Sequence, residues 1–254
     1  MPFMTLSHET NAPYKVHLDT VNRDLHPHLH PEQFCLARHQ RYVWTAADSR
    51  SVIVVNKGVL AVDVIIRGLP RQILDFLMPG DIAPATVAAS PRHLSIRAIT
   101  DATLTRVGGQ AANGMPVPPL EQDVRAELHL VMLGHLDTDA RVATFLLDHA
   151  ARNGVSEPHQ LLPLPMSRDD IADYLAINRD TLSRIFMKLE KLNIIERVNR
   201  HAVRILDFEF LTRSTPIPTL HGRRDNASER DRAAPSQAPP RIGEIGVPGL
   251  MPST

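Results

Sequence analysis

The chain has 254 residues, 43% of them apolar, and a formal net charge of +0 at pH 7. This length predicts one large or two modest domains with a real core, and the neutral balance excludes a chain that binds nucleic acid through overall positive charge. Cys35 is the single cysteine, which excludes an intramolecular disulfide and an iron-sulfur cluster held by cysteines of one chain.

No apolar run approaches the roughly 18 residues of a membrane span, and the first residues lack the charged-then-apolar pattern of a secretory leader. We therefore expect a cytoplasmic protein that does not interact with a membrane.

Residues 1–33 are rich in Pro, His, Asn and Asp without sustained periodicity, so we expect an irregular arm. Its HPHLHP stretch places His26, His28 and His30 at alternate positions near Cys35. Imidazoles at this spacing are candidate ligands for zinc, copper or haem iron, and Cys35 is a candidate redox switch. Histidines in a Pro-rich arm are more often solvated, and a single cysteine is more often structural, so we expect no bound cofactor.

From Phe34 to Val107 the pattern changes to short apolar runs typical of β-strands. The stretch SVIVVNKGVLAVDVIIRG (51–68) holds two such runs, separated at Asn56-Lys57-Gly58, where glycine supplies the positive φ that a tight hairpin needs. Two further runs, ILDFLM (73–78) and LSIRAI (94–99), follow. Strands at this spacing predict a small sandwich or barrel-like roll.

After a linker (108–119), the segment LEQDVRAELHLVMLGHL (120–136) has apolar residues at three- and four-residue steps, which predicts a helix with one apolar stripe. The stripe consists of Leu120, Val124, Leu128 and Val131, with Met132 on its flank. It either packs on its own domain or pairs with a second copy of the chain as a dimerisation helix. A second helix is predicted over 138–153, ending at Gly154.

Residues 166–195 predict two short helices joined by a tight turn. Ser167 and Asp170 resemble a capping box for a first helix that runs to about Ala176, and Asn178 is a good N-cap for a second helix from Arg179 to about Leu192. This arrangement is typical of a helix-turn-helix, and IIERVNRHAVRIL (194–206) adds the β-hairpin of a winged variant.

The face of the second helix opposite its apolar residues is polar and charged. It carries Arg179, Asp180, Ser183, Arg184 and Lys188. A solvated helix surface has the same composition. However, residues 179–204 contain seven Arg or Lys and three acids, and a local surplus of four positive charges in a neutral chain favours a phosphate-binding surface.

The segment MSRDDIADYLAINRDTLSRIFMKLEKLNII (166–195) resembles the helix-turn-helix of the CRP/FNR family of bacterial transcription regulators, most closely its FNR and FixK-like branch. The resemblance extends to the strand region with its Pro79-Gly80-Asp81 turn, to the 120–136 helix and to 140–154, about 180 residues in all. It implies an α+β fold with an N-terminal β-roll, which is a cyclic-nucleotide-binding-like jelly roll, then a long dimerisation helix and a C-terminal winged helix-turn-helix. The corresponding ranges are 34–119, 120–137 and 138–214. The Pro- and Arg-rich tail, 215–254, is expected to be disordered.

For function, the resemblance implies a sequence-specific transcription regulator. The scattered His and Asp residues form no recognisable nucleophile or metal-hydrolase motif, so we expect no enzyme. Its expected partners are double-stranded DNA, a second copy of the chain, and RNA polymerase if it is an activator. Asp180, Ser183 and Arg184 fall where the FNR branch has its base-reading Glu, Ser and Arg, and Arg179 falls where the cAMP-receptor branch has a further base-reading Arg. The implied target is a near-palindromic site with TTGAT-like half-sites. Asp180 stands where the family has Glu, so the side chain that carries this acceptor is one methylene shorter, which bears on the exact base preference.

The remaining roles follow from the same resemblance. Ser167, Arg168 and Lys188 are expected to contact phosphates, and Leu120, Val124, Leu128 and Val131 to form the dimer interface.

The sensor region departs from the family pattern in two respects. Oxygen sensing by an iron-sulfur cluster needs several cysteines, and Cys35 alone cannot supply them. The stretch DIAPATVAASPRHLS (81–95) lacks the acid that holds the ribose of a cyclic nucleotide and has Arg92-His93 where the family has Arg-Ser. We therefore expect regulation without cAMP and without a cluster. The alternative is a sensor whose DNA binding requires a small molecule, haem or a metal in the roll or the His-rich arm.

Overall fold

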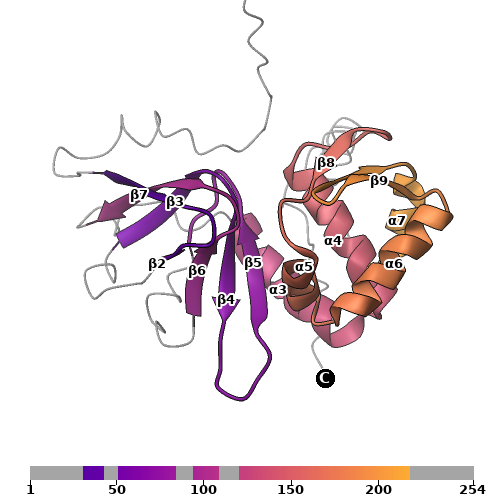
Figure 1. Cartoon of the computed structure of the whole chain (residues 1–254), viewed down its shortest axis with the longest axis horizontal. Coiled ribbons are helices and arrows are strands. Elements are labelled where there is room, and N and C mark those ends of the chain that lie inside the picture. The colour runs from indigo at the N-terminus through magenta and orange to yellow at the C-terminus, as the bar shows by residue number, and fades with distance from the viewer. Residues whose placement is uncertain (1–30, 43–50, 84–93, 109–119, 218–254) are drawn as a thin grey trace, which may run out of the picture. The chain divides into compact units, whose positions relative to one another are not determined.

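The computed structural model describes residues 31–42, 51–83, 94–108 and 120–217, and for residues 120–123 it describes the backbone only. The first three ranges form the strands of two antiparallel sheets (Figure 1). One sheet has the order β1 (Glu32–Leu36), β7 (Ala102–Gly108), β3 (Ser51–Lys57). The other has the order β2 (Arg41–Tyr42), β6 (Leu94–Ala98), β4 (Leu60–Val64), β5 (Gln72–Leu77).

The two sheets share one apolar core. Alternating side chains of β3, β4, β6 and β7 pack together in it, including Ile53, Val62, Ile96 and Leu104. Burying one face of each sheet in this way produces the sandwich-like roll that the short apolar runs predict. The first strand begins at Glu32, so the predicted arm ends slightly before residue 33. His26, His28 and His30 lie outside the described residues.

The predicted hairpin at Asn56-Lys57-Gly58 is wrong. Strand β3 pairs with β7, whereas β4 pairs with β5 and β6, so the chain passes from one sheet to the other at this point. The positive φ expected of Gly58 is present, at +89°. A Cβ there would lie 2.4 Å from the carbonyl oxygen of Asp101, so glycine is required by close backbone approach as well as by φ.

Helix α3 (Leu120–His135) is followed after two residues by α4 (Thr138–Arg152), close to both predicted ranges. Asp137 caps α4 by accepting a hydrogen bond from the Ala140 N–H at 2.8 Å. One side of α3 packs on the rest of the chain, where His129 lies against the Tyr174 ring with centroids 4.1 Å apart and Met132 is buried.

The predicted helix-turn-helix is confirmed. Helix α5 (Arg168–Leu175) has the complete capping box between Ser167 and Asp170. It ends at Ala176, whose φ of +51° turns the chain. Helix α6 (Arg179–Lys191) follows and is capped by Asn178, whose side-chain oxygen accepts from the Thr181 N–H at 2.7 Å. Both helix starts thus follow the side-chain signals in the sequence.

The wing is a three-stranded sheet in the order β8 (Leu161–Pro163), β10 (Ala202–Ile205), β9 (Ile195–Asn199). Its β9–β10 hairpin is the predicted one, while β8 and the final helix α7 (Phe208–Arg213) were not predicted. Thr215, which the sequence assigns to the tail, is buried, and its hydroxyl lies 2.6 Å from that of Thr144. The packed region therefore extends past residue 214 to 217, and the predicted tail from 218 lies outside the described residues.

Candidate nucleic-acid interface

Helix α6 buries one face and exposes the opposite one. The buried residues are Leu182, Ile185, Phe186 and Leu189. Asp180 and Arg184 are exposed on the other side, and both come within the first two turns, because the helix begins at Arg179. The N-terminal turns of a recognition helix are the part that contacts base edges. The structure therefore exposes these two side chains in the first turns of α6, while their contact with bases stays a prediction.

Arg179 and Ser183 have local contacts that a DNA complex would have to rearrange. Arg179 is exposed, with its Nε 3.7 Å from an Asp169 carboxylate oxygen. Ser183 is half-buried, and its hydroxyl donates to the Arg179 carbonyl at 2.9 Å. Both residues lie on the edge of the exposed face rather than at its centre.

The three expected phosphate contacts have different surroundings. The Ser167 hydroxyl is engaged in the α5 capping box. The Arg168 guanidinium lies over the Phe186 ring, 3.7 Å from its centroid, and burial together with the charge of Arg197 lowers its pKa to about 10. Lys188 is exposed and pairs with Asp139 at the start of α4, and this hydrogen bond raises the pKa of the lysine. A phosphate contact by Arg168 would require the side chain to leave the ring.

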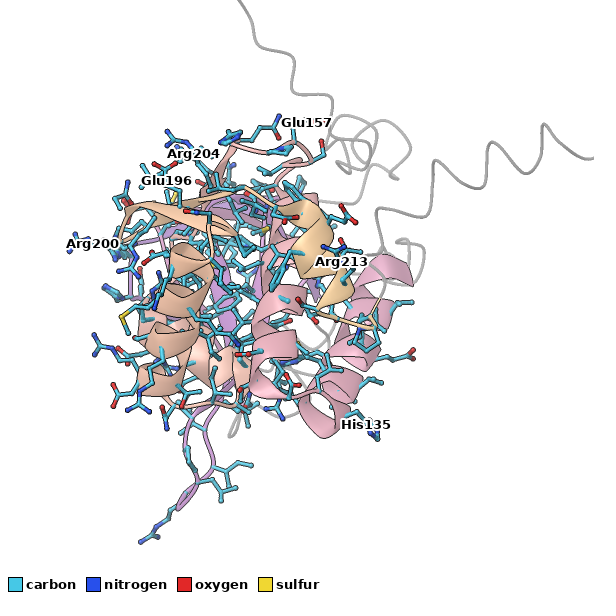
Figure 2. All side chains as sticks on the ribbon, turned by 90° about the vertical axis from the view of Figure 1, so that its right-hand side faces the viewer. His135, Glu157, Glu196, Arg200, Arg204 and Arg213 are labelled. Atoms are coloured by element: carbon cyan, nitrogen blue, oxygen red, sulfur yellow. The ribbon has the colours of Figure 1, made fainter. Side chains whose placement is uncertain are left out.

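Two basic residues outside the predicted set have no ion-pair partner within the part of the chain that the structure describes. Lys191 is exposed at the end of α6, and Arg200 is exposed at the tip of the β9–β10 turn. Figure 2 shows Arg200 extending from the wing on the same side of the view as α6. By contrast, Arg197 and Arg204 of the wing pair with Glu190 and Glu196. Unpaired cations are the better phosphate ligands, because no protein carboxylate competes for them.

The predicted dimer stripe on α3 is only partly covered by the chain itself. Val124 and Leu128 are half-buried and Val131 is 46% exposed, while the side chain of Leu120 lies outside the described set. The neighbouring Leu130, which the sequence analysis did not select, is 70% exposed. Met132 points inward and is buried.

Of the redox and metal candidates, only Cys35 lies within the described residues. Cys35 is exposed on β1, and its Sγ lies 3.9 Å from the Thr103 hydroxyl. Among the described residues, no group of His, Cys, Asp and Glu is arranged to hold a metal ion. Residues 84–93, which include Arg92 of the cyclic-nucleotide comparison, lie outside the described ranges. No described helix is long and apolar enough to cross a membrane.

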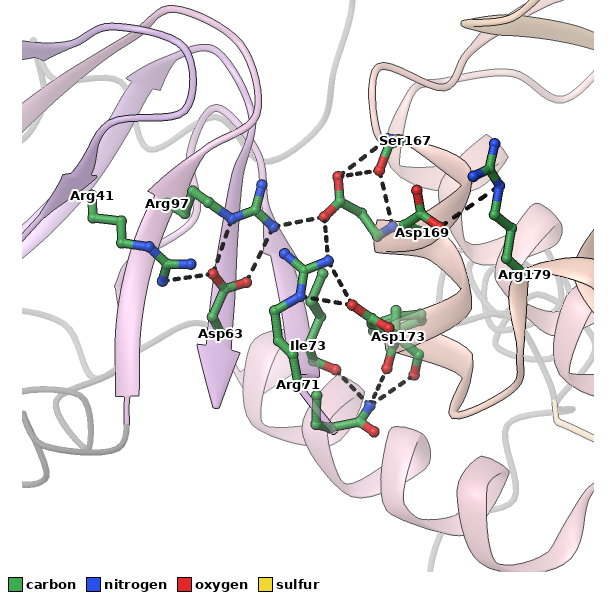
Figure 3. A network of polar contacts seen from close by, with 12 residues as sticks. Arg41, Asp63, Arg71, Ile73, Arg97, Ser167, Asp169, Asp173 and Arg179 are labelled. Carbon is green, nitrogen blue, oxygen red and sulfur yellow. Dashed lines mark hydrogen bonds and ion pairs between the residues drawn. The ribbon is translucent and has the colours of Figure 1, made fainter. Parts of the chain in front are cut away.

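A network of buried ion pairs joins the roll to α5, and the sequence analysis missed it (Figure 3). Arg97 on β6 donates to Asp63 on β4 at 2.9 Å and 3.2 Å, and to Asp170 on α5 at 2.7 Å. Arg41 also pairs with Asp63, at 2.9 Å, and Arg71 donates to Asp170, also at 2.9 Å. Asp170 is the capping-box residue of α5, so one carboxylate both starts a helix of the helix-turn-helix and binds two arginines of the roll.

The charge states in this network follow from its geometry. Burial alone would raise the pKa of Asp170, but hydrogen bonds from Ser167 and the charge of Arg97 outweigh it and lower that pKa. Burial alone would lower the pKa of Arg97, but the carboxylates of Asp63 and Asp170 raise it. Asp170 and Arg97 are therefore charged at neutral pH, and each of these two charges has an opposite partner in the network.

A second network lies where β5 meets α3 and α4. Arg125 of α3 donates to Asp75 at 2.8 Å, and Arg152 of α4 donates to Asp81 at 2.7 Å. Burial would lower the pKa of Arg125, but Asp75 and Asp81 outweigh it and raise that pKa. These pairs fix the helices that follow the roll against its β5 strand.

A roll of two antiparallel sheets, followed by helices and a capped, winged helix-turn-helix, defines a class of DNA-binding regulators. Residues 140–214 match the model of the Crp-like helix-turn-helix domain. The nitrogen fixation regulation protein FixK of Rhizobium meliloti is 30% identical over 161 residues, which are 62% of this chain and 74% of FixK. The transcriptional activatory protein AadR of Rhodopseudomonas palustris is 31% identical over 212 residues, 72% of this chain and 84% of AadR.

Among solved structures, FixK2 of Bradyrhizobium japonicum has the same fold, with a TM-score of 0.62 at 24% identity, covering 74% of this chain and 99% of FixK2. The chain belongs to the CRP/FNR family of transcription regulators, in its FixK-like branch. The resemblance found from the sequence is thus confirmed, as is the α+β fold class. The family consists of transcription regulators and not of enzymes.

Proposed function

We propose that this chain, a DNA-binding transcription regulator of the CRP/FNR type, acts as a homodimer on a near-palindromic site with TTGAT-like half-sites. The observation that carries the proposal is the exposed face of α6, where Asp180 and Arg184 are placed by the Asn178 cap within the first two turns. Its site of action is then the bacterial cytoplasm. If the chain activates transcription, RNA polymerase is a further partner.

The side chains of α6 suit the edges of base pairs in the major groove. Arg184 can place two donors on the acceptors of guanine, and the Asp180 carboxylate can accept from the amino group of cytosine. Arg179 and Ser183 complete the base-reading set once their contacts with Asp169 and the helix backbone exchange for DNA. Lys191 and Arg200, together with Ser167, Arg168 and Lys188, supply the phosphate contacts that fix the register.

A homodimer is supported by the exposed apolar residues of α3. Leu130 and Val131 are large, exposed and adjacent on a helix between the roll and the helix-turn-helix. Pairing of two α3 helices about a two-fold axis buries them and the stripe of Val124 and Leu128, and it sets two α6 helices about one turn of DNA apart, roughly 34 Å.

Sedimentation of the purified chain tests the dimer directly. Leu130→Glu should shift the species from dimer to monomer, because it places a charge in the pairing surface. Leu69→Glu, a matched change at an exposed leucine of the β4–β5 turn, should leave the dimer intact. A wild-type chain that sediments as a monomer at micromolar concentration contradicts the proposed assembly.

We further propose that DNA binding requires neither cAMP nor an iron-sulfur cluster. Selection of preferred sites from a random DNA pool, in air and with no added ligand, should enrich an inverted repeat. Failure of a folded dimer to enrich any sequence would favour the alternative, a regulator gated by a small molecule, haem or metal. A ligand-induced rise in melting temperature or a visible absorption spectrum would then identify the effector class.

A further inference from the structure

The centre of the exposed face of α6 contains an apolar residue. Successive residues of a helix are about 100° apart, so residues at alternating steps of four and three lie on one face. On α6, four residues at such steps lie opposite the buried face. These are Asp180, Arg184, Met187 and Lys191. Met187 is 54% exposed, although it is large and apolar.

The neighbours of Met187 on this face are suited to DNA. Arg184 lies one turn before it and Lys191 one turn after it, and neither has an ion-pair partner among the described residues. A methionine between two unpaired cations is therefore carried into contact with whatever polyanion they bind. More than half of the Met187 surface stays exposed in the folded chain, so folding gains only part of what full burial of this side chain would contribute.

The major groove offers one apolar group to such a side chain, the C5 methyl of thymine. Methionine is long, unbranched and polarizable, so it can adjust to a methyl group whose position varies with the local twist of the DNA. Phosphates and the polar edges of guanine, cytosine and adenine give a thioether no comparable contact.

We propose that Met187 is a specificity-determining residue that recognises a thymine of each half-site through its C5 methyl group. The inference rests on the proposed function, because it requires α6 to lie in the major groove. Met187 follows Asp180 by seven residues, which is about 10 Å along the helix and roughly three base-pair steps. The thymine therefore flanks the bases read by the first turns of α6.

Deoxyuridine scanning of the selected site tests the assignment, because uracil differs from thymine only by the absent methyl group. Each thymine is replaced symmetrically in both half-sites, and the dissociation constant is measured by fluorescence anisotropy. For the wild-type chain, uracil at one thymine position should lower the affinity for DNA about three- to fivefold per half-site. This factor corresponds to the free energy of burying one methyl group. That loss should disappear in Met187→Ala and persist in Met187→Leu.

Leu192→Ala is the matched control, because Leu192 is 51% exposed at the end of the same helix but points in a different direction. In Leu192→Ala, the loss of affinity on replacing each thymine by uracil, called the uracil penalty, should equal that of the wild type. If every uracil penalty is the same in Met187→Ala as in the wild type, or if no thymine shows a penalty, Met187 does not recognise a methyl group. If the wild type enriches no site at all, the proposed function fails instead.

Discussion

Replacement of Arg97 by methionine should destabilise the chain strongly, because it removes the arginine that joins Asp63 of the roll to Asp170 of α5. Methionine keeps most of the aliphatic volume and deletes only the charge and the donors. Three hydrogen bonds disappear, at 2.9 Å, 3.2 Å and 2.7 Å. Asp63, which is 0% exposed, then keeps only the ion pair with Arg41.

The expected magnitude follows from what remains. Breaking a buried ion pair by removing one partner costs about 3–5 kcal/mol. Arg41 still pairs with Asp63, and Arg71 and Ser167 still bind Asp170, so we expect the lower end, about 3 kcal/mol of the free energy of unfolding. In a chain of this size that corresponds to a fall in melting temperature of roughly 6–12 °C.

Urea denaturation followed by circular dichroism measures the change, and hydrogen exchange locates it. The amides of α5 should exchange faster in Arg97→Met, since the capping residue Asp170 loses a partner. Arg213→Met is the control, because Arg213 makes only an exposed pair with Glu209 on α7 and should change stability by less than about 0.5 kcal/mol. If Arg97→Met is as stable as this control, the buried network does not stabilise the fold.

Two further predictions concern Lys188 and His149. Asp139→Asn should free Lys188, so the affinity for random DNA should rise and depend more steeply on salt. Lys188→Ala should weaken binding to all sequences and reduce the slope of log affinity against log salt by about one. If neither variant changes DNA binding, Lys188 does not contact phosphate and serves only the ion pair between α6 and α4. Burial and the charge of Arg152 lower the pKa of His149 to about 3, and its Nε2 donates to the Pro163 carbonyl. The unfolded chain therefore binds a proton that the folded chain does not as the pH falls below about 6.5, and stability should drop by roughly 1.4 kcal/mol per pH unit between pH 6 and 5. His149→Gln should show a shallower drop in urea midpoint over this range, and equal slopes would refute the assignment.

The helix-turn-helix could be predicted from the sequence because its signals are local. Ser167 and Asp170 are three residues apart, and Asn178 directly precedes its helix, so side chain and backbone meet without help from the rest of the fold. The apolar spacing of α6 then fixed which face is buried. The exposed positions of Asp180 and Arg184 follow from that spacing alone.

The sheet crossing and the ion-pair network could not be predicted, because both depend on contacts between distant parts of the sequence. Gly58 gives the same local signal in a hairpin and in a crossing between sheets, and only the pairing of β3 with β7 distinguishes them. Arg97 is 34 positions from Asp63 and 73 from Asp170. The capping signal at Ser167 likewise places Arg168 at the start of α5 but does not show that its guanidinium lies over the Phe186 ring of α6.

The most direct test of the central claim is the DNA motif selected from a random pool by the wild type, by Arg184→Ala and by Arg213→Ala. Recognition through α6 predicts that the wild type and Arg213→Ala select the same inverted repeat. Arg184→Ala should lose the preference at one position of each half-site, with a loss of binding free energy of about 1–3 kcal/mol per contact. A wild-type motif that Arg184→Ala leaves unchanged would contradict recognition by this helix. A folded dimeric chain that selects no motif would contradict constitutive sequence-specific binding.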